Sequence, residues 1–434
     1  MSLVGKDELD VAMTAPFDAT LLDDIRSRFL YVDEDPFSGQ KRAFLENGGG
    51  SLTLKSVVHN SAEVMGIPDG SSRGNAAARQ LLERINAGKM AARCFFGAGG
   101  DDSGQLVTAA TGTEILFRLA RTILLQSSSG SVVSSCLEHA ASHDAAGYWA
   151  SRLGFRHISV ALPASTGVIG PDDYAHAVKA DTVLATVIHT SHVTGMRADL
   201  SAIVKAIRSK SPSCFVLCDG IQHAAHGPID VGSYDVDAYV FSPYKVFSHR
   251  SGALGWIAHR LAVMPHEKME GKAAENWDLG GRDPALFAGL AAVVDYLSWL
   301  GGRFTKDAEP RSRVVAAMQA VNRHEAGLIH FLIHGKNGLR GLIDLPRVTV
   351  IGETGIARRE GAVSFNVRGR SSRDVVAALE AQGARTHFRL NEPSSSSRFV
   401  LQSLGLDDCV RVSFCHYNTA EEVGRVLSVL SQLV

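Results

Sequence analysis

The sequence has almost no net charge, because 44 basic side chains stand against 45 acidic ones and give a formal net charge of -1. Nucleic acids and anionic membrane surfaces attract proteins with a clear excess of lysine and arginine, so we expect neither as a partner. We find no apolar run long enough to span a bilayer, and the N-terminus lacks the charged and then apolar order of a signal peptide. We therefore expect no membrane association.

Cysteine is also scarce, and the six cysteines occur singly, several of them inside apolar strand-like runs. This pattern excludes a disulfide framework and predicts a protein of the reducing cytoplasm. No second cysteine pair completes a zinc site with Cys214 and Cys218, so most of the cysteines are expected in the core. The cysteines are Cys94, Cys136, Cys214, Cys218, Cys409 and Cys415.

The 434 residues, 45% hydrophobic and 21% charged, are enough for one large domain and a smaller one. From about residue 107, apolar strand-like runs alternate with amphipathic helices. This alternation predicts an α/β fold with a mostly parallel sheet covered on both faces. The strand-like runs include 131–137, 157–161, 183–190, 215–219 and 238–242, and the helix-like runs include 113–126, 142–153 and 200–209.

Four regions are predicted along the chain. Residues 1–45 are polar and irregular and would contribute to the small domain or to a dimer. Residues 46–300 form the large domain, 301–332 a connecting helix and 333–434 a small α+β domain. One helical stretch is expected from residue 284 to about 332. The small domain is predicted to have strands 347–351, 362–367, 384–388 and 409–415, helices 373–382 and 420–433, a capping box at Thr419 and Glu422, and a mobile loop at 394–397.

Two polar residues stand at the ends of neighbouring buried strands. Asp219 closes the run Phe-Val-Leu-Cys-Asp, and Lys245 follows Ala-Tyr-Val-Phe-Ser-Pro-Tyr. Pyridoxal 5'-phosphate (PLP) needs such a pair, because its aldehyde forms a Schiff base with an amine and its ring nitrogen needs an anion to stay protonated. The pair predicts PLP as the cofactor.

These segments resemble the class V aminotransferase family, which includes cysteine desulfurases, selenocysteine lyases and isopenicillin N epimerase-like proteins. The resemblance runs from about Phe44 to the C-terminus and is strongest in residues 218–255 and 410–422. It implies the PLP-dependent transferase fold type I, with a large domain and a smaller C-terminal α+β domain. It also implies a homodimer with its sites near the interface.

The resemblance assigns five roles around the predicted cofactor. Lys245 would be the Schiff-base lysine that also moves the substrate Cα proton, and Asp219 would pair with the pyridinium nitrogen. Gln222 would hydrogen-bond the phenolic oxygen, and Ser242 would bind the phosphate. Arg411, in Val-Arg-Val-Ser-Phe-Cys-His-Tyr-Asn-Thr, would bind the substrate carboxylate through its planar fork.

Three further motifs match the same family. Gly112 and Thr113, in Ala-Thr-Gly-Thr-Glu, resemble a turn into a helix whose N-terminus suits a phosphate dianion. His139, in Glu-His-Ala-Ala-Ser, resembles the catalytic histidine that stacks on the cofactor ring. His192, in Ser-His-Val-Thr-Gly, lies in a stretch near the cofactor oxygen. The alternatives are an ordinary helix start and a strand-end histidine with structural roles only.

Three positions depart from the family pattern. Tyr244 stands where desulfurases carry a phosphate-binding histidine, and its phenol could still donate there. His192 replaces an asparagine; it could donate a hydrogen bond, and its charge would respond to pH near neutrality. Gly281 replaces a threonine that reaches the partner subunit's phosphate, so that contact would come from the backbone or from Arg282.

The most informative departure is a missing cysteine. The nucleophilic cysteine of desulfurases lies on a loop shortly before the arginine strand, and the corresponding residues 385–393 contain none. Cys409 and Cys415 lie within the strand run itself. Persulfide formation needs a mobile thiolate, so the sequence argues against a true cysteine desulfurase. His223 and His226 lack a third ligand, and no metal is expected.

Three activities remain open for an amino-acid substrate whose side chain the sequence does not reveal. The first is a PLP-dependent lyase that cleaves a Cβ–X bond, with X most often sulfur, by α,β-elimination without an enzyme nucleophile. The second is an aminotransferase, and the third is an epimerase. A catalytically idle PLP scaffold is disfavoured by the intact set Lys245, Asp219 and Arg411.

Overall fold

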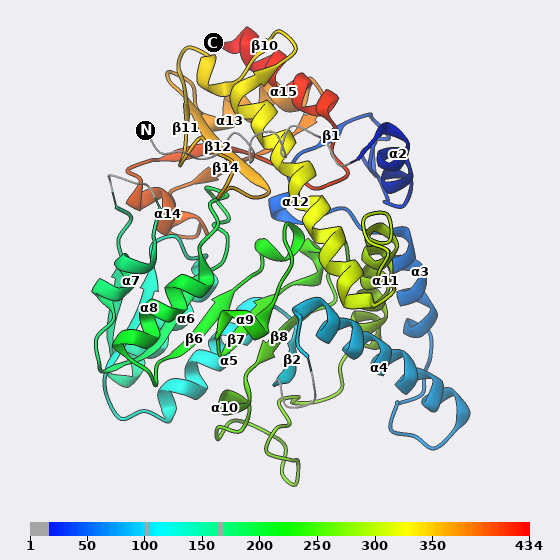
Figure 1. The fold of residues 1–434 in the computed structure, drawn as a ribbon, viewed down its shortest axis with the longest axis vertical. Helices are drawn as coiled ribbons and strands as arrows, with labels where there is room; N and C mark the ends of the chain where they lie inside the picture. The colour runs from blue at the N-terminus through cyan, green and yellow to red at the C-terminus, as the bar shows by residue number, and fades with distance from the viewer. Residues whose placement is uncertain (1–16, 100–103, 164–167) are drawn as a thin grey trace.

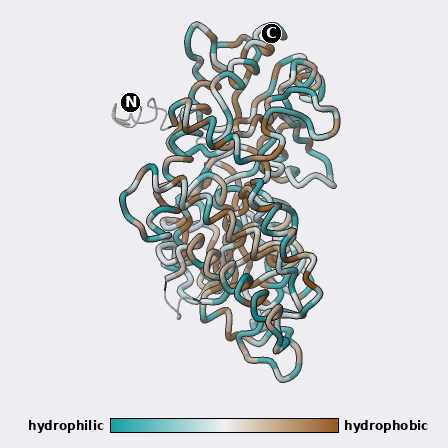
Figure 2. The backbone as a smooth tube through the Cα atoms, turned by 90° about the vertical axis from the view of Figure 1, so that its right-hand side faces the viewer, coloured by the Kyte–Doolittle hydropathy of each residue, from teal (hydrophilic) through white to brown (hydrophobic). Residues whose placement is uncertain are grey.

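The computed structural model describes residues 17–99, 104–163 and 168–434 as two domains stacked along the long axis (Figure 1). The expectation about a signal peptide falls on residues that lie outside this description. Hydrophobic stretches of the chain gather inside the larger domain, and hydrophilic stretches lie mostly at its surface (Figure 2).

The large domain is built on a seven-stranded sheet with the order β2-β8-β7-β6-β5-β3-β4. Strand β8 runs antiparallel to both of its neighbours, and the other neighbouring pairs are parallel. The predicted α/β class with a mostly parallel sheet is therefore confirmed. The strands are β2 (Gln105–Ala109), β3 (Ser131–Ser135), β4 (Arg156–Val160), β5 (Thr182–Ile188), β6 (Phe215–Asp219), β7 (Ala238–Phe241) and β8 (Ala253–Ile257).

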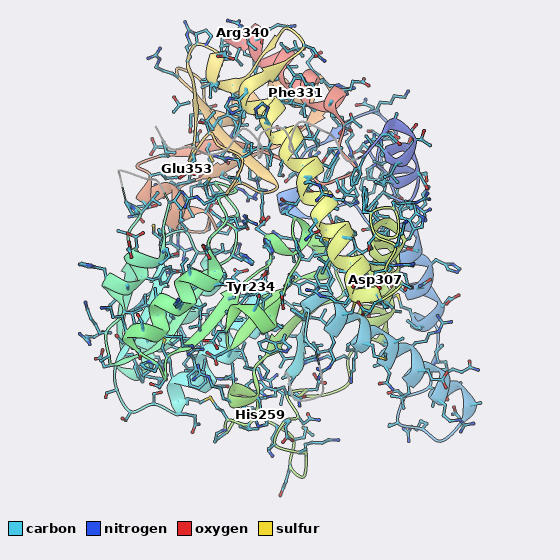
Figure 3. All side chains as sticks on the ribbon, in the orientation of Figure 1. Tyr234, His259, Asp307, Phe331, Arg340 and Glu353 are labelled. Atoms are coloured by element: carbon cyan, nitrogen blue, oxygen red, sulfur yellow. The ribbon has the colours of Figure 1, made fainter. Side chains whose placement is uncertain are left out.

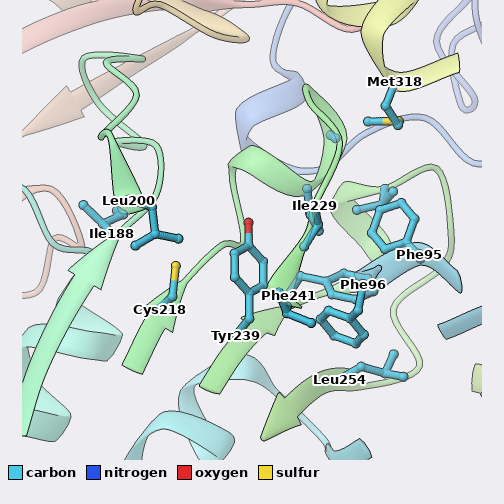
Figure 4. Packing of buried hydrophobic residues seen from close by; sticks show 14 of the residues in the cluster. Phe95, Phe96, Ile188, Leu200, Cys218, Ile229, Tyr239, Phe241, Leu254 and Met318 are labelled. Atoms are coloured by element: carbon cyan, nitrogen blue, oxygen red, sulfur yellow. The ribbon is translucent and has the colours of Figure 1, made fainter. Parts of the chain in front are cut away.

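Both faces of this sheet are apolar, which explains the near-continuous hydrophobic runs. On one face, Leu217 and Val240 pack with helices α5 (Gly112–Leu125) and α6 (Ala140–Leu153). On the other face, Tyr239 and Phe241 pack with Phe95 and Phe96 of helix α4 (Ala76–Phe96) (Figure 4). Each such aromatic side chain stabilises the fold by roughly 1.5–3 kcal/mol through burial.

The remaining helices of the large domain surround these layers (Figure 1), and one of them, α8, packs Leu200 and Ile203 into the same core as Tyr239 and Phe241. They are α2 (Ala19–Ser27), α3 (Lys55–Met65), α7 (Pro171–Ala177), α8 (Leu200–Lys210), α9 (Val231–Tyr234), α10 (His259–Ala262) and α11 (Pro284–Gly301).

Helix α11 is long and apolar enough to cross a membrane by length and composition, with a mean hydropathy of 1.4 over 18 residues. The expectation that the chain has no such run is therefore wrong. In the structure, 72% of the helix is buried, and it packs against α3, α4 and α12 (Pro310–His334). Its apolar character therefore serves the core.

The prediction of a single helical stretch from residue 284 to 332 is also wrong. Helix α11 ends at Gly301, and a second helix, α12, begins at Pro310. A Cβ on Gly301 would lie 1.9 Å from the carbonyl oxygen of Arg313, so the two helices come into close contact there. Glu309 caps α12 by accepting a hydrogen bond from the amide of Ser312. This helix runs from the region of Asp307 beside the large domain to Phe331 in the small domain (Figure 3).

The small domain contains a four-stranded antiparallel sheet with the order β11-β12-β15-β14. Helix α15 begins with the predicted capping box of Thr419 and Glu422. The elements are β11 (Val348–Val350), β12 (Ala362–Val367), β14 (His387–Leu390), β15 (Asp408–Ser413), the hairpin β9 (Gly335–Lys336) and β10 (Leu339–Arg340), α13 (Ser372–Ala381), α14 (Arg398–Ser403) and α15 (Ala420–Leu433).

One strand of this domain differs from the expectation. The predicted strand 384–388 is divided, and its first part, β13 (Ala384–Arg385), pairs in parallel with β1 (Ala43–Phe44) from the N-terminal region. The serine tract 394–397 is a loop, as predicted, whose last residue Ser397 is buried directly before helix α14, and its mobility stays a prediction. The proposed boundaries between the four regions remain predictions.

Candidate active site

A cavity of about 300 Å³ opens at the carboxyl ends of the parallel strands, where ligands bind in open α/β sheets. Helix α5 points its N-terminus into the cavity. Every residue predicted to contact the cofactor lines it. These residues are Gly112, Thr113, His139, His192, Asp219, Gln222, Ser242, Tyr244 and Lys245.

Lys245 ends a short 3-10 turn after β7 and is half-buried. Its Nζ donates a hydrogen bond to the carbonyl of Gly48 at 2.8 Å. Burial lowers the pKa of Lys245 to about 7; the positive charges of Arg411 and Arg389 add to this, and Asp219 opposes it. A large fraction of the amine is therefore neutral at physiological pH, as a nucleophile or base requires.

Asp219, the last residue of β6, leaves one carboxylate oxygen without a partner. Oδ1 accepts a hydrogen bond from the amide of Ile221 at 3.1 Å, whereas Oδ2 is buried and has none. Burial raises the pKa of Asp219 to about 6, although the Ile221 amide and the charge of Lys245 act in the opposite direction. A buried acceptor without a donor is costly. The protonated ring nitrogen of PLP would supply the missing donor, so this residue fits the cofactor.

The N-terminus of α5 forms a cup for a phosphate group. A Cβ on Gly112 would lie 2.8 Å from Cδ1 of Ile221 and 3.3 Å from Oγ of Ser242, so a glycine is needed to keep this space open. Free backbone amides and the helix dipole favour a dianion there. Arg250, which the sequence reading did not single out, also lines the cavity, with its Cζ 4.0 Å from the ring centroid of Tyr244. The cup, with Ser242 and Arg250 beside it, fits the phosphate of PLP.

His139 is neutral in this environment. It caps α6 by accepting the amide hydrogen of Ala141 on Nδ1 at 3.0 Å, which places the ring proton on Nε2. Burial lowers the pKa of His139 to about 4, and the charge of Lys245 lowers it further. A neutral ring facing the cavity suits stacking on a pyridine ring. That stacking role and the catalytic role remain predictions.

His192 differs from its expected behaviour in two ways. Its Nε2 donates to the carbonyl of Ser396 at 3.1 Å, so the buried and unpartnered Nδ1 carries a lone pair and can only accept. Burial, together with His139 at a ring distance of 4.8 Å, holds the pKa of His192 well below its ordinary value. The expectations that it donates to the cofactor oxygen and titrates near neutrality are therefore wrong.

A glycine turn from the N-terminal region enters the site. The carbonyl of Gly48 accepts hydrogen bonds from Lys245 and from Nε2 of Gln222, the latter at 3.0 Å. The amide of Gly48 donates to Oγ of Ser413 at 2.9 Å, which ties the turn Asn47–Gly49 to β15. Three consecutive glycines at 48–50 mark this turn in the sequence, but its contacts with Lys245, Gln222 and Ser413 could not be predicted from them.

Arg411 lies beside the cavity without lining it, because the turn Asn47–Gly49 covers it. The side chain is fully buried; its Nη1 donates to the carbonyl of His192 at 2.6 Å, and Nε and Nη2 have no partner. A Cβ on Gly48 would lie 2.8 Å from Cζ of Arg411, which shows how closely the turn packs on the guanidinium. Two free donors in one plane match a carboxylate.

Arg282 is held within its own chain, since its Nε and Nη2 donate to the side chain and carbonyl of Thr108, each at 2.9 Å. A contact to a partner subunit remains a prediction. His223 and His226 pair with Glu360 and Glu325, respectively, each at 2.8 Å.

A different group of possible metal ligands includes His226 but not His223. The ligand atoms of His226, Glu325 and Cys415 lie within 4.8 Å of one another, so the expectation about the pair of histidines stays a prediction. The Nδ1 of His226 is already hydrogen-bonded to Glu325.

No cysteine is among the residues that line the cavity. Cys409, on β15, is buried, and burial raises the pKa of its thiol to about 11. Cys415 is likewise buried, and burial raises its thiol pKa well above the ordinary value. A nucleophilic thiolate requires the opposite conditions.

Comparison with known proteins identifies the family. The aminotransferase class-V family matches residues 44–279 and 315–426. An aminotransferase-like protein of Gibberella zeae is 27% identical over 434 residues, which cover 95% of this chain and 98% of that protein. A cysteine desulfurase-like protein of Aspergillus flavus is 28% identical over 442 residues, which cover 95% of this chain and 90% of that protein.

Solved structures share the fold. A cysteine desulfurase of Thermococcus onnurineus, solved in the apo form, has a TM-score of 0.78 at 19% identity and covers 95% of this chain and 98% of its own. A cysteine desulfurase of Escherichia coli has a TM-score of 0.76 at 19% identity, and the match covers 96% of this chain and 98% of that protein. The chain therefore belongs to the class V aminotransferase family, has the type I fold of PLP-dependent transferases, and is a PLP-dependent enzyme related to cysteine desulfurases.

Proposed function

We propose that this enzyme is a lyase that breaks a Cβ–X bond of an L-amino acid, with X most often sulfur, by α,β-elimination. The observation that carries the proposal is the composition of the cavity wall, which offers the amine of Lys245 as a base and no thiol. A desulfurase that forms a persulfide needs an enzyme thiolate, whereas elimination needs only a base and a stable leaving group.

Each step has a group in this chain to perform it. Bound PLP supplies an electron sink for the charge left when the substrate loses its Cα proton. The free Nε and Nη2 of Arg411 hold the α-carboxylate, Nζ of Lys245 removes the Cα proton, and Oδ2 of Asp219 holds the proton on the ring nitrogen. The Cα–H and Cβ–X bonds break, and X leaves as HX. Water then hydrolyses the released 2-aminoacrylate to pyruvate and ammonia.

An aminotransferase is the second candidate, and the similarity to the aminotransferase-like protein of Gibberella zeae favours it. It would use the same lysine, aspartate and arginine, but the amino group would stay on the enzyme for transfer to a second ketoacid. An epimerase would return the Cα proton to the opposite face. The products separate these three activities.

The test uses the purified enzyme loaded with PLP and incubated with S-methyl-L-cysteine, β-chloro-L-alanine or L-alanine. Elimination predicts pyruvate, ammonia and methanethiol or chloride in equal amounts from the first two, and no pyruvate from L-alanine. Cys94→Ser and Cys409→Ser should keep this activity, whereas Lys245→Ala should lower it by about 100-fold or more. Pyruvate from L-alanine with conversion of the cofactor to its amine form would establish transamination instead.

We further propose a homodimer that works in a reducing compartment. All six cysteines are free thiols, which supports the compartment. Light scattering of the eluting protein would measure the mass of the assembly, and a monomeric mass would exclude the dimer.

A further inference from the structure

A second arginine lies beside Arg411 on the same face of the small-domain sheet. Strands β14 and β15 pair so that His387 lies opposite Arg411 and Arg389 lies opposite Cys409. Alternate residues of a strand share a face, and directly opposite residues share it too. Arg389 is therefore the diagonal neighbour of Arg411, at a separation that two long side chains readily bridge.

The guanidinium of Arg389 lacks an anionic partner. Its side chain is half-buried, its Nε is buried without a hydrogen bond, and it makes no ion pair within the described residues. Glu46 is the carboxylate whose charge acts on both arginines, but it contacts Arg385 at 3.4 Å and His387 at 3.5 Å instead. Unpaired buried cations are costly, and an anion that binds between them removes this cost.

The positive charge of Arg389 also reaches the catalytic groups. It lowers the pKa of Lys245 after the larger effects of burial and of Arg411, and it contributes in the same direction at His139 and His192. Lys245, His139 and His192 line the cavity, so the charge of Arg389 acts on groups of the active site. A substrate with one carboxylate would satisfy Arg411 and leave Arg389 without a partner.

We propose that the substrate is an L-amino acid whose side chain carries an anionic group, a carboxylate or an oxidised sulfur acid, and that Arg389 binds this group while Arg411 binds the α-carboxylate. The proposal rests on the proposed function in that it names the substrate class of the same site. Arg389 is then a specificity-determining residue, and the enzyme distinguishes anionic side chains from isosteric neutral ones.

Inert ligands test the proposal without any turnover. Succinate carries two carboxylates, and its monoamide, succinamate, has the same shape with one charge fewer. Calorimetric titration of the PLP-loaded enzyme should show succinate binding about 10- to 100-fold more tightly, since a hydrogen bond to a charged group contributes about 1.5–3 kcal/mol. Arg389→Gln should reduce this preference to about threefold or less, and Arg389→Lys should retain part of it.

The control is Arg373→Gln, which removes an exposed arginine that lies over the Phe388 ring at 4.8 Å and should keep the full preference. Equal binding of succinate and succinamate to the wild type, or a full preference in Arg389→Gln, would overturn the proposal. If Arg389→Gln fails to fold, Arg389→Lys replaces it in the test. The proposal would then be overturned if Arg389→Lys binds succinate as tightly as the wild type and prefers it over succinamate to the same extent. Because no bond is broken in the titration, the two proposals fail separately. A positive titration with no elimination from S-carboxymethyl-L-cysteine, whose side chain is anionic, would reject the lyase and keep the substrate class.

Discussion

At the scale of single residues, the site depends on two groups whose pKa values move toward each other. Burial lowers the pKa of Lys245 to about 7 and raises that of Asp219 to about 6. Each group thereby carries its charge less firmly than it would in water. Bound PLP reverses this situation at Asp219, because the ring nitrogen brings a positive charge to the free Oδ2.

The lowered pKa of Lys245 predicts how fast the apoenzyme takes up PLP. Only the neutral amine attacks the aldehyde, and a lowered pKa keeps the amine neutral down to lower pH. The uptake rate should therefore rise through about pH 7 and level off above it, rather than rise toward the ordinary lysine value of about 10.5. Stopped-flow absorbance from pH 6 to 10 measures this rate. A rise that continues to pH 10 would contradict the shifted pKa.

Asp219→Asn should separate folding from catalysis. The asparagine can still accept from the Ile221 amide, but its amide group no longer keeps the ring nitrogen protonated. We expect kcat to fall by about 100-fold or more while PLP still binds.

The raised pKa of Asp219 means that its ionised form destabilises the apoprotein above about pH 6. Without PLP, the Asp219→Asn variant should therefore unfold at the same urea concentration as the wild-type apoprotein or at a higher one. Asp235→Asn, which changes an exposed carboxylate, is the control. A variant with undiminished kcat would show that the ring nitrogen does not depend on Asp219.

At the scale of elements, the turn Asn47–Gly49 joins the two halves of the site. It touches Lys245 and Gln222 of the large domain and packs against Arg411 and Ser413 on β15. The substrate-binding arginine is therefore positioned by a segment far away in the sequence.

Two neighbouring glycines give a matched pair of variants for this turn. Gly48→Ala would place a methyl group 2.8 Å from Cζ of Arg411, whereas Gly49→Ala would come no closer than 3.4 Å, to Oε1 of Glu46. We expect Gly48→Ala to raise KM by about 10-fold or more, because small displacements at a binding fork are costly, and Gly49→Ala to leave it nearly unchanged. Steady-state kinetics measures both. Equal KM values would mean that the turn does not position Arg411.

Periodicity located the elements that are buried on both faces or strongly amphipathic. The strand Phe215–Asp219 and the helix Ala420–Leu433 have the predicted bounds. The edge strand Gln105–Ala109 and the antiparallel strand Ala253–Ile257 were missed, because a short run with polar or glycine residues gives little signal. The helix break after Gly301 was missed although Gly301, Gly302 and Pro310 are signals in the sequence that a helix ends and another begins.

The candidate site shows the same limit. Lys245 and Asp219 could be predicted because each follows a recognisable strand. The contacts of Arg389 and Gly48 could not be predicted, since they depend on the register of β14 and on segments that are distant in the sequence.

At the scale of the whole molecule, a buried carboxylate connects the domains. Glu360 precedes β12 and accepts hydrogen bonds from Thr190 and His223 of the large domain, each at 2.8 Å, with Arg197 at 3.4 Å. Burial alone would raise the pKa of Glu360, but His223 and Arg197 offset this effect and hold it below the ordinary value. The relative position of the domains depends on this charge.

Glu360→Gln should destabilise the protein by about 3 kcal/mol at pH 7, because a buried pair loses one partner. A lowered carboxylate pKa contributes stability above the unfolded value of about 4.5, and this contribution is lost as the pH falls toward the folded value. The difference between variant and wild type should therefore shrink below pH 4.5. Urea denaturation at pH 7 and pH 4 measures this difference. The control is Glu353→Gln, which removes a solvent-accessible ion pair with Arg358 and should lower the free energy of unfolding by less than about 1 kcal/mol. A constant difference at both pH values would contradict this role.

The turn at residues 47–49 has a consequence for the order in which the protein is made. Asn47 bonds to Ser413 and Asn418, 366 and 371 residues later in the chain. The ribosome adds about 5–20 residues per second, so these partners emerge roughly 20–70 s after the turn. The seven-stranded sheet is complete in sequence by Ile257, whereas the substrate side of the active site must wait for the last strand. A nascent chain can thus form its cofactor floor long before it can hold a substrate.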